Sequence, residues 1–227
     1  MLIDVIIPAY NEEKSIGKVL DDIPKEWVRE VIVCNNNSTD NTKEEALNHG
    51  ATVLDQPQKG YGSACLKGLE YLDKKEKKPD IVVFLDGDYS DHPEEMPKLL
   101  KPIIEDNYEM VIGSRALGDL EKGAMQPQQV FGNWLATSLI KLIYKKVFTD
   151  LGPFRAITYD ALLRINMQDQ DFGWTVEMQV KAAKLKIKST EVAVTYRKRI
   201  GVSKVSGTLK GTILAGHKIL WTIFKLI

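Results

Sequence analysis

The sequence predicts an α/β fold in which helices cover both faces of a mainly parallel β-sheet. Short apolar runs rich in β-branched residues, typical of strands buried on both faces, alternate along the chain with segments whose apolar residues recur at helical spacing. Clusters of polar residues follow the ends of these runs. Alternating strands and helices indicate parallel strands joined by crossover helices, and such sheets bind ligands beyond the carboxyl ends of their strands.

The expected elements follow in order from the N-terminus. Buried strands are predicted at residues 5–7, 31–33, 81–85 and 110–112. Helices are predicted between them, at about 12–23, 41–49, 61–72 and 93–105. The second half is less regular, and there we expect helices at about 130–148 and 174–184, an edge strand at 191–196 and an apolar helix at 209–227. No internal repeat interrupts this order, so a single domain is expected.

Composition narrows the function classes. Lysine plus arginine equals aspartate plus glutamate, at 31 each among 227 residues, so no overall basic charge indicates nucleic-acid binding. Cys34 and Cys65 are too few for a disulfide framework or a zinc cluster. The N-terminus lacks the pattern of a signal peptide, and the apolar stretches are shorter than a bilayer span. We therefore expect a cytoplasmic protein whose C-terminal end is a candidate for contact with the inner face of the membrane.

The strongest chemical signal is a pair of carboxylates at the end of a buried strand. Asp86 and Asp88 flank Gly87, directly after the apolar run 81–85. Mg²⁺ and Mn²⁺ bind carboxylates together with phosphate oxygens, and Mg²⁺ commonly lies between one or two acids and a substrate diphosphate. Asp-Gly is also a common turn dipeptide, but its position at a strand end favours a metal and nucleotide-diphosphate site.

Two further polar segments are expected at the same edge of the sheet. Asn35, Asn37 and Ser38 follow the second strand, where amide groups suit a nucleobase edge or a ribose because they both donate and accept hydrogen bonds. Lys59 and Gly60 open the third helix, where backbone N–H groups favour an anion. Neither a GxGxxG motif after the first strand nor a GxxxxGK[ST] motif is present, which argues against dinucleotide oxidoreductases and P-loop enzymes.

Several motifs are spread along nearly the whole chain: VIIPAYNEE at 5–13, NNNSTDNT at 35–42, FLDGDYSDHPEEM at 84–96, VIGSR at 111–115, TDLGPFRAI at 149–157, GWTVEM at 173–178 and YRKRIGVSKVSGT at 196–208. Together they resemble glycosyltransferase family 2, in the branch of the dolichyl-phosphate mannose and glucose synthases. The resemblance implies a Rossmann-like GT-A fold and an inverting, metal-dependent transfer of a hexose from a UDP- or GDP-sugar. It also divides the chain into a nucleotide-sugar-binding half at 1–115, an acceptor-side half at 116–208 and a C-terminal amphipathic helix at 209–227.

The resemblance assigns roles to individual residues. Asp88 matches the principal metal ligand, and Asp86 matches the acid that reaches the ribose or sugar. Arg115 matches an arginine near the donor sugar, and Arg199 matches one that assists the departing diphosphate. The remaining nucleotide-contacting positions are Pro8, Ala9, Tyr10, Glu12, Ser203 and Lys204. Asn35 stands where many relatives have a base-contacting aspartate, so UDP is favoured over GDP only weakly.

The acceptor and the general base stay open at this point. A phosphate acceptor such as a polyprenyl phosphate, the leading choice, arrives ionised and needs no base, whereas a hydroxyl acceptor does. The candidate bases are Asp150, Asp171 and Glu177, and Arg155 and Trp174 lie in the same acceptor-side motifs. Transfer to a hydroxyl of a lipid or saccharide is the alternative reaction. A non-catalytic nucleotide-sugar-binding protein is the alternative from another class.

The C-terminal segment 209–227 carries a further expectation. Its lysines Lys210, Lys218 and Lys225 fall on one side of a helix, and apolar residues occupy most of the remainder. Such a helix lies at a membrane surface or packs on the protein's own core. The segment 130–148 presents the same choice, and peripheral membrane contact is favoured modestly.

Overall fold

The computed structural model describes residues 1–201 and 209–226, without the side chains of 209–215. One seven-stranded sheet has the order β3-β2-β1-β4-β6-β5-β7. Its strands are β1 (Ile3–Ala9), β2 (Glu30–Asn35), β3 (Thr52–Asp55), β4 (Ile81–Phe84), β5 (Met110–Ser114), β6 (Arg155–Thr158) and β7 (Ser189–Ala193). All neighbouring strands are parallel except that β6 runs antiparallel to both β4 and β5. The expected mainly parallel α/β sheet is confirmed.

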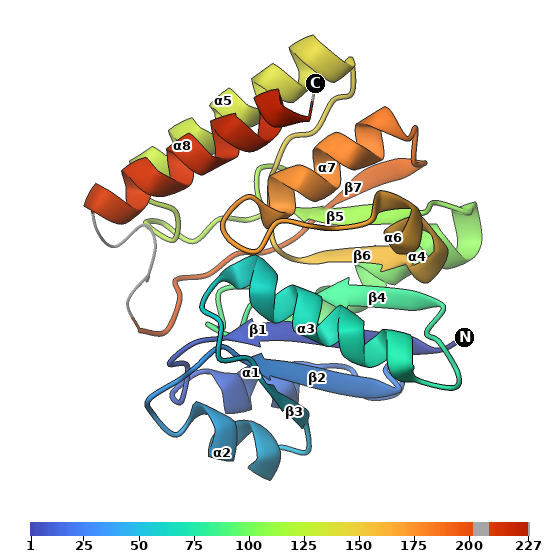
Figure 1. Cartoon of the computed structure of the whole chain (residues 1–227), viewed down its shortest axis with the longest axis vertical. Coiled ribbons are helices and arrows are strands. Elements are labelled where there is room, and N and C mark those ends of the chain that lie inside the picture. The colour runs from blue at the N-terminus through green and yellow to red at the C-terminus, as the bar shows by residue number, and fades with distance from the viewer. Residues whose placement is uncertain (202–208, 227) are drawn as a thin grey trace.

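Helices cover both faces of this sheet (Figure 1). The helices α1 (Ile16–Asp22), α2 (Thr42–Asn48) and α4 (Met96–Asp106), the last preceded by the 3₁₀ turn η1 (Pro93–Glu95), pack on one face. On the other face lie α3 (Tyr61–Lys74), α6 (Tyr159–Ile165) and α7 (Trp174–Lys184), with α5 (Pro127–Tyr144) and α8 (Leu209–Lys225) beside α7. Two apolar cores result, one on each side of the sheet.

The sequence missed three elements and misplaced the ends of others. Strands β3 and β6 and helix α6 were not predicted. Helix α1 begins at Ile16 rather than near residue 12, because Glu12 and Ser15 form a turn in which the Ser15 N–H donates to the Glu12 carbonyl. The edge strand β7 was predicted, although it spans residues 189–193 rather than 191–196. Helix α7 has the predicted bounds.

The sheet brings the polar segments to one edge. Strands β1, β2 and β4 are parallel, so their carboxyl ends at Ala9, Asn35 and Phe84 lie at the same edge. Strand β6 runs in the opposite direction, and its first residue, Arg155, pairs with Phe84 and therefore lies at that edge too. No helix within residues 1–201 and 209–226 is long and apolar enough to cross a bilayer.

Candidate active site

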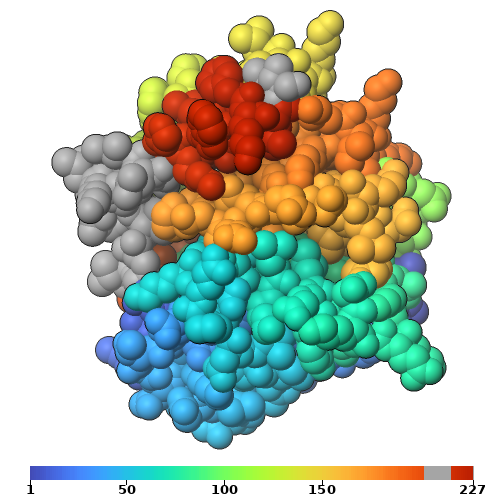
Figure 2. All heavy atoms as spheres, viewed as in Figure 1, coloured from blue at the N-terminus to red at the C-terminus, as the bar shows by residue number. Residues whose placement is uncertain are grey.

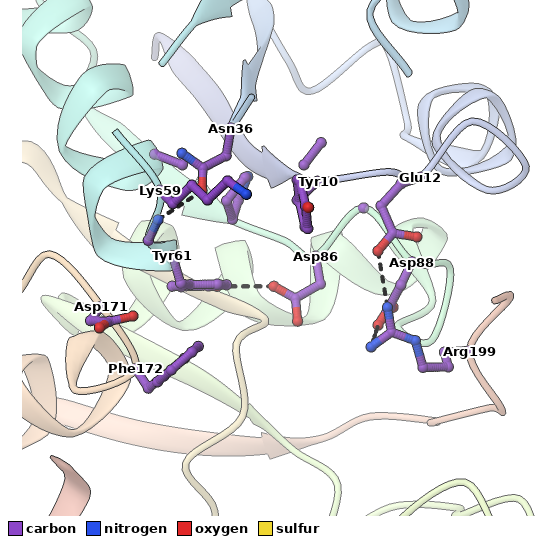
Figure 3. Close-up of a pocket in the computed structure, with 15 residues that line it drawn as sticks. Tyr10, Glu12, Asn36, Lys59, Tyr61, Asp86, Asp88, Asp171, Phe172 and Arg199 are labelled. Atoms are coloured by element: carbon purple, nitrogen blue, oxygen red, sulfur yellow. Dashed lines mark hydrogen bonds and ion pairs between the residues drawn. The ribbon is translucent and has the colours of Figure 1, made fainter. Parts of the chain in front are cut away.

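A cavity of about 460 Å³ opens at the carboxyl ends of the central strands (Figure 3). Its walls come from the segments after β1 and β4, the N-terminal end of α3 and the segment before α7. The lining residues are Pro8, Ala9, Tyr10, Glu12, Asn36, Lys59, Gly60, Tyr61, Ala64, Asp86, Gly87, Asp88, Asp171, Phe172 and Arg199. Ten residues proposed from the sequence as nucleotide contacts thus lie around one cavity: Pro8, Ala9, Tyr10, Glu12, Lys59, Gly60, Asp86, Gly87, Asp88 and Arg199.

Asp86 lies at the base of this cavity and is held by one hydrogen bond from the third helix. The Tyr61 hydroxyl donates to Asp86 Oδ1 at 2.9 Å. Burial, followed by the nearby charge of Asp88, raises the pKa of Asp86 to about 7. Ionisation of Asp86 beside Asp88 is therefore unfavourable until a cation binds near them. Paired carboxylates that bind a metal ion, or a metal ion carried by a phosphate group, typically behave in this way.

Asp88 and Glu12 share one cation, the guanidinium of Arg199. Arg199 Nη1 lies 3.2 Å from Asp88 Oδ2, and Nη2 lies 2.9 Å from Glu12 Oε1. Figure 3 shows Arg199 reaching between the two carboxylates from the chain beyond β7. The other oxygen of Asp88 accepts the backbone N–H of Ser90 at 2.9 Å, which fixes the carboxylate. Arg199 thus offsets part of the negative charge of Asp88, the predicted metal ligand, and of Glu12, a predicted nucleotide contact.

The residues present fit a divalent cation whose remaining coordination positions are filled by the substrate. Among the described residues, no group of three or more histidine, cysteine, aspartate or glutamate side chains is arranged to hold a metal. Mg²⁺ and Mn²⁺ at nucleotide sites characteristically take only one or two protein carboxylates, and the other positions go to phosphate oxygens and water. Asp88 supplies such a carboxylate, with Asp86 beside it, so this site suits a cation that arrives with a diphosphate.

The segment before α3 is fixed by Asn36, which lines the cavity. Its side-chain amide donates to the carbonyls of Gln56 and Gln58, and its Oδ1 accepts the N–H of Gly60 at 2.9 Å. Lys59 is thereby held over the cavity, with its ammonium 5.4 Å from the centre of the Tyr10 ring. A cation and a helix N-terminus at one wall favour an anionic ligand there.

The other polar residues after β2 do not line the cavity. Asn35 is buried, with its amide donating to Asp55 Oδ1 at 3.0 Å and its Oδ1 accepting the Ser38 N–H at 3.2 Å. Ser38 Oγ accepts the N–H of Asn11 at 3.1 Å, and Asn37 is exposed. These contacts give Asn35 and Ser38 a part in shaping the loop, and their role as readers of a nucleobase stays a prediction.

A second cavity of about 320 Å³ adjoins the first and shares Tyr61, Asp86, Asp88, Phe172 and Arg199 with it. Its remaining walls come from the chain after β5, from α5, from the start of α7 and from α8: Arg115, Met125, Gln128, Gln129, Gly132, Asn133, Leu151, Pro153, Trp174, Thr175, Tyr196, Gly216 and Ile219. Two connected cavities that meet at a pair of carboxylates suit two reactants that exchange a group between them.

Arg115 stands in the second cavity and is held by Asp150. Its Nε and Nη2 donate to the two Asp150 oxygens, each at 2.7 Å, and its guanidinium lies 5.0 Å from the centre of the Tyr196 ring. Burial works to raise the pKa of Asp150, but the charge and hydrogen bonds of Arg115 outweigh it and hold that pKa below its usual value. Asp150 is thus a partner of Arg115, not a carboxylate directed into the cavity.

The other acceptor-side candidates divide between scaffold and cavity. Glu177 is buried, and its oxygens accept the N–H groups of Gln168 and Asp169. Arg155 is fully buried and donates only to backbone carbonyls, and burial lowers its pKa to about 10. Trp174 lines the second cavity and Asp171 the first. Ser203 and Lys204 lie outside the described residues.

A third acid, Asp91, is buried without a hydrogen-bond partner for its carboxyl oxygens among the described residues. Burial, followed by the charges of Asp86 and Asp88, raises its pKa well above the usual value. The raised pKa favours the neutral form of this carboxyl, which limits the negative charge close to Asp86 and Asp88.

Four residues that line the first cavity were not among the predicted site residues: Asn36, Tyr61, Ala64 and Phe172. Asn36 belongs to the run of three asparagines that was noted in the sequence. Which of the three side chains faces the cavity depends on the register of the strand before them, which the sequence does not show. Tyr61 was noted only as the start of a helix. Phe172 follows Asp171 in a segment that showed no regular pattern.

A family model described as Glycosyl transferase family 2 matches residues 4–165. The chain is 34% identical over 196 residues to the glycosyltransferase AglJ of Haloferax volcanii, a match that covers 86% of this chain and 63% of that one. It therefore spans less than two thirds of the length of that relative. It is 28% identical to an undecaprenyl-phosphate mannosyltransferase of Micrococcus luteus, over 93% of this chain and 90% of the relative.

Solved structures agree on the fold. A glucosyl-3-phosphoglycerate synthase of Mycobacterium tuberculosis, crystallised with Mn²⁺, uridine diphosphate and phosphoglyceric acid, superposes with a TM-score of 0.80 at 21% identity. The superposition covers 99% of this chain and 78% of that one.

Proposed function

The chain belongs to glycosyl transferase family 2 and has the GT-A fold, and we propose that it transfers a hexose with inversion from a nucleotide diphosphate sugar to a polyprenyl phosphate in a membrane. The nucleotide sugar would occupy the cavity at the ends of β1 and β4, and the acceptor would enter the second cavity. The two cavities share Asp86, Asp88 and Arg199, so the reacting bond would lie beside these residues.

On the donor side, the chain supplies charges of both signs around the expected diphosphate. When bound, Mg²⁺ or Mn²⁺ supplies positive charge that stabilises the departing diphosphate, and Asp88, with Asp86 beside it, would hold the ion. Arg199 would leave the carboxylates and donate to the diphosphate oxygens, which gain negative charge as the bond to the sugar breaks. Arg115, fixed by Asp150, would contact the sugar from the second cavity.

On the acceptor side, one observation carries the choice of a phosphate. The only carboxylates among the described residues lining the second cavity are Asp86 and Asp88, which belong equally to the donor site. Of the three candidate bases, Asp150 and Glu177 are bonded elsewhere, and Asp171 lines the first cavity but not the second. A hydroxyl acceptor needs a base for its proton, whereas an ionised phosphate oxygen attacks the anomeric carbon directly while the diphosphate leaves with the bonding electron pair. A site without a dedicated base thus favours a phosphate acceptor.

The relatives support this proposal at different levels. One is named for mannosyl transfer to undecaprenyl phosphate. The solved neighbour was crystallised with uridine diphosphate and Mn²⁺, in keeping with the modest preference for UDP and with a divalent metal.

Transfer to a hydroxyl is the second candidate, and the raised pKa of Asp86 is the observation that favours it. A carboxyl whose pKa is about 7 is suited to take a proton near neutral pH. The solved neighbour was crystallised with phosphoglyceric acid, a molecule that carries a hydroxyl.

Calorimetric titration with UDP- and GDP-sugars, with and without Mn²⁺, tests the donor site. We expect one nucleotide class to bind in a Mn²⁺-dependent manner, and Asp88→Asn to abolish that binding. Binding that is indifferent to Mn²⁺ and to Asp88→Asn would contradict the proposed site. Donor binding without turnover across phosphate and hydroxyl acceptors would favour a non-catalytic nucleotide-sugar-binding protein.

A further inference from the structure

Two helices on the acceptor side expose large apolar residues along one edge of the molecule. In Figure 1, α5 and α8 lie side by side along the edge farthest from β3 and α2, and contacts between the two helices agree. Among the described side chains of these two helices, the exposed large apolar residues are Val130, Phe131, Trp134, Leu142, Trp221 and Phe224, and we call this set the aromatic ridge. Figure 2 shows α8 at the outer surface of the molecule, partly covering α5 in this view.

The ridge is not part of the protein's core. Trp134 is 60% exposed and Trp221 is 57% exposed, whereas α5 buries its opposite side through Ala136 and Ile140. Phe131 and Trp134 pack on each other with their ring centres 5.8 Å apart. An exposed aromatic pair of this kind, with further exposed apolar residues on the same two helices, is typical of an interaction site.

The charged residues that α5 and α8 themselves carry have one sign. Neither α5 nor α8 contains an aspartate or glutamate. Lys141 and Lys145, at the end of α5, and Lys225, at the end of α8, are exposed. Tryptophan and phenylalanine beside lysine are the residues that enter the headgroup region of a bilayer and attract anionic lipids. Two copies of this chain joined through their ridges would bring like charges together, which disfavours a second copy as the partner.

The same helices build the acceptor cavity. Gln128, Gln129, Gly132 and Asn133 of α5 and Gly216 and Ile219 of α8 line it. The cavity and the ridge therefore lie on different sides of the same pair of helices, and the width of one helix, roughly 10 Å, separates the cavity from the surface that the ridge contacts.

We propose that the aromatic ridge docks this protein on a bilayer containing anionic phospholipid, so that α5 and α8 bring the acceptor cavity to the level of the lipid headgroups. This inference rests on the proposed function, because a lipid-linked phosphate would then reach the cavity without leaving the membrane. The aromatic side chains supply apolar burial, and the lysines at the ends of both helices supply attraction to the anionic surface.

Vesicle sedimentation of the full chain tests the ridge. We expect the protein to sediment with vesicles of phosphatidylcholine and phosphatidylglycerol, less with phosphatidylcholine alone, and less at high salt. The double variants Phe131→Ser/Trp134→Ser and Trp221→Ser/Phe224→Ser should each weaken binding by at least about tenfold, because each removes two aromatic side chains whose apolar surface would be buried in the bilayer. Iodide quenching of tryptophan fluorescence should fall when vesicles are added to the wild type.

Matched controls separate the ridge from general effects. Leu47→Ser on α2 and Leu163→Ser on α6 remove exposed leucines, 51% and 57% exposed, far from the ridge, and should leave vesicle binding unchanged. Equal binding by the ridge variants and the wild type would overturn the proposal, as would absence of wild-type binding to anionic vesicles. Light scattering that shows a wild-type dimer lost in the ridge variants, without vesicle binding, would identify a second copy as the partner instead.

Donor titration keeps this test distinct from that of the proposed function. Retained Mn²⁺-dependent nucleotide-sugar binding by the ridge variants shows that they fold, so weaker vesicle binding is then due to the ridge. Vesicle binding by a wild-type chain that binds no nucleotide sugar would support the ridge and refute the enzyme. Donor binding without vesicle binding would refute the ridge alone.

Discussion

Replacing Arg199 by alanine should strengthen the binding of Mn²⁺ in the absence of nucleotide while weakening turnover. The guanidinium lies 3.2 Å from Asp88 and 2.9 Å from Glu12, so an incoming cation must displace it. At an effective dielectric constant of about 20, two unit charges at such distances attract by about 5–6 kcal/mol. Solvent reaches 26% of the Arg199 side chain, and desolvation offsets much of the attraction. If removal of the guanidinium makes the free energy of Mn²⁺ binding more favourable by a net value of about 1.4 kcal/mol, Mn²⁺ should bind about tenfold more tightly.

The assay is a titration of nucleotide-free protein with Mn²⁺, followed by the electron paramagnetic resonance signal of the free ion. Turnover with a saturating nucleotide sugar should fall in the same variant by about 100-fold, because Arg199 would no longer stabilise the diphosphate as it leaves. Lys198→Ala is the control, because it removes an equal charge from the same segment but pairs with Glu121. Unchanged or weaker Mn²⁺ binding in Arg199→Ala would refute the reasoning.

Three further predictions test the site and its supports. Folding raises the pKa of Asp86 from 3.8 to about 7, so the folded state binds this proton more tightly than the unfolded state. The metal-free protein should therefore lose stability as the pH rises from about 4 to about 7. In thermal denaturation, the melting temperature of Asp86→Asn should depend less on pH over this interval than that of the wild type. Asp150→Asn leaves the buried Arg115 without its charged partner and should cost about 3–5 kcal/mol in urea denaturation, whereas a cost below about 1 kcal/mol would mean that the pair is dispensable. A Cβ on Gly62 would lie 2.0 Å from the Asp169 carbonyl oxygen, so Gly62→Ala should lower the free energy of unfolding by about 1–3 kcal/mol and weaken donor binding. Gly132 has open space around it, so the control variant Gly132→Ala should not lower the free energy of unfolding measurably.

The sequence predicted those parts of the fold that have a strong hydrophobic pattern. The buried cores of β1, β2, β4 and β5 are continuous apolar runs, and each was found. Strand β3 is only partly buried and four residues long, so its pattern was weak. Strand β6 begins with Arg155, whose charge breaks the apolar run although the side chain is fully buried. Its antiparallel direction depends on long-range pairing that no local pattern encodes.

The site was predictable where residue type and strand ends coincide. Asp86 and Asp88 follow a strong strand signal, and the structure places them at the junction of both cavities. The choice of Asn36 over Asn35 to line the cavity depends on which side chains point outward after β2. The pairing of Arg115 with Asp150 joins positions 35 residues apart. The second cavity needs α5, α7 and α8 to pack together, which is a property of the assembled fold.

The central claim is transfer of a hexose to a phosphate on a polyprenyl chain. The most direct measurement follows radiolabelled hexose from the nucleotide sugar that binds, with Mn²⁺, onto undecaprenyl phosphate or onto undecaprenol, which differs only by the phosphate. Asp88→Asn serves as the inactive control. We predict labelled lipid from undecaprenyl phosphate and none from undecaprenol. Label on undecaprenol, or label on a saccharide hydroxyl with none on undecaprenyl phosphate, would contradict the proposal.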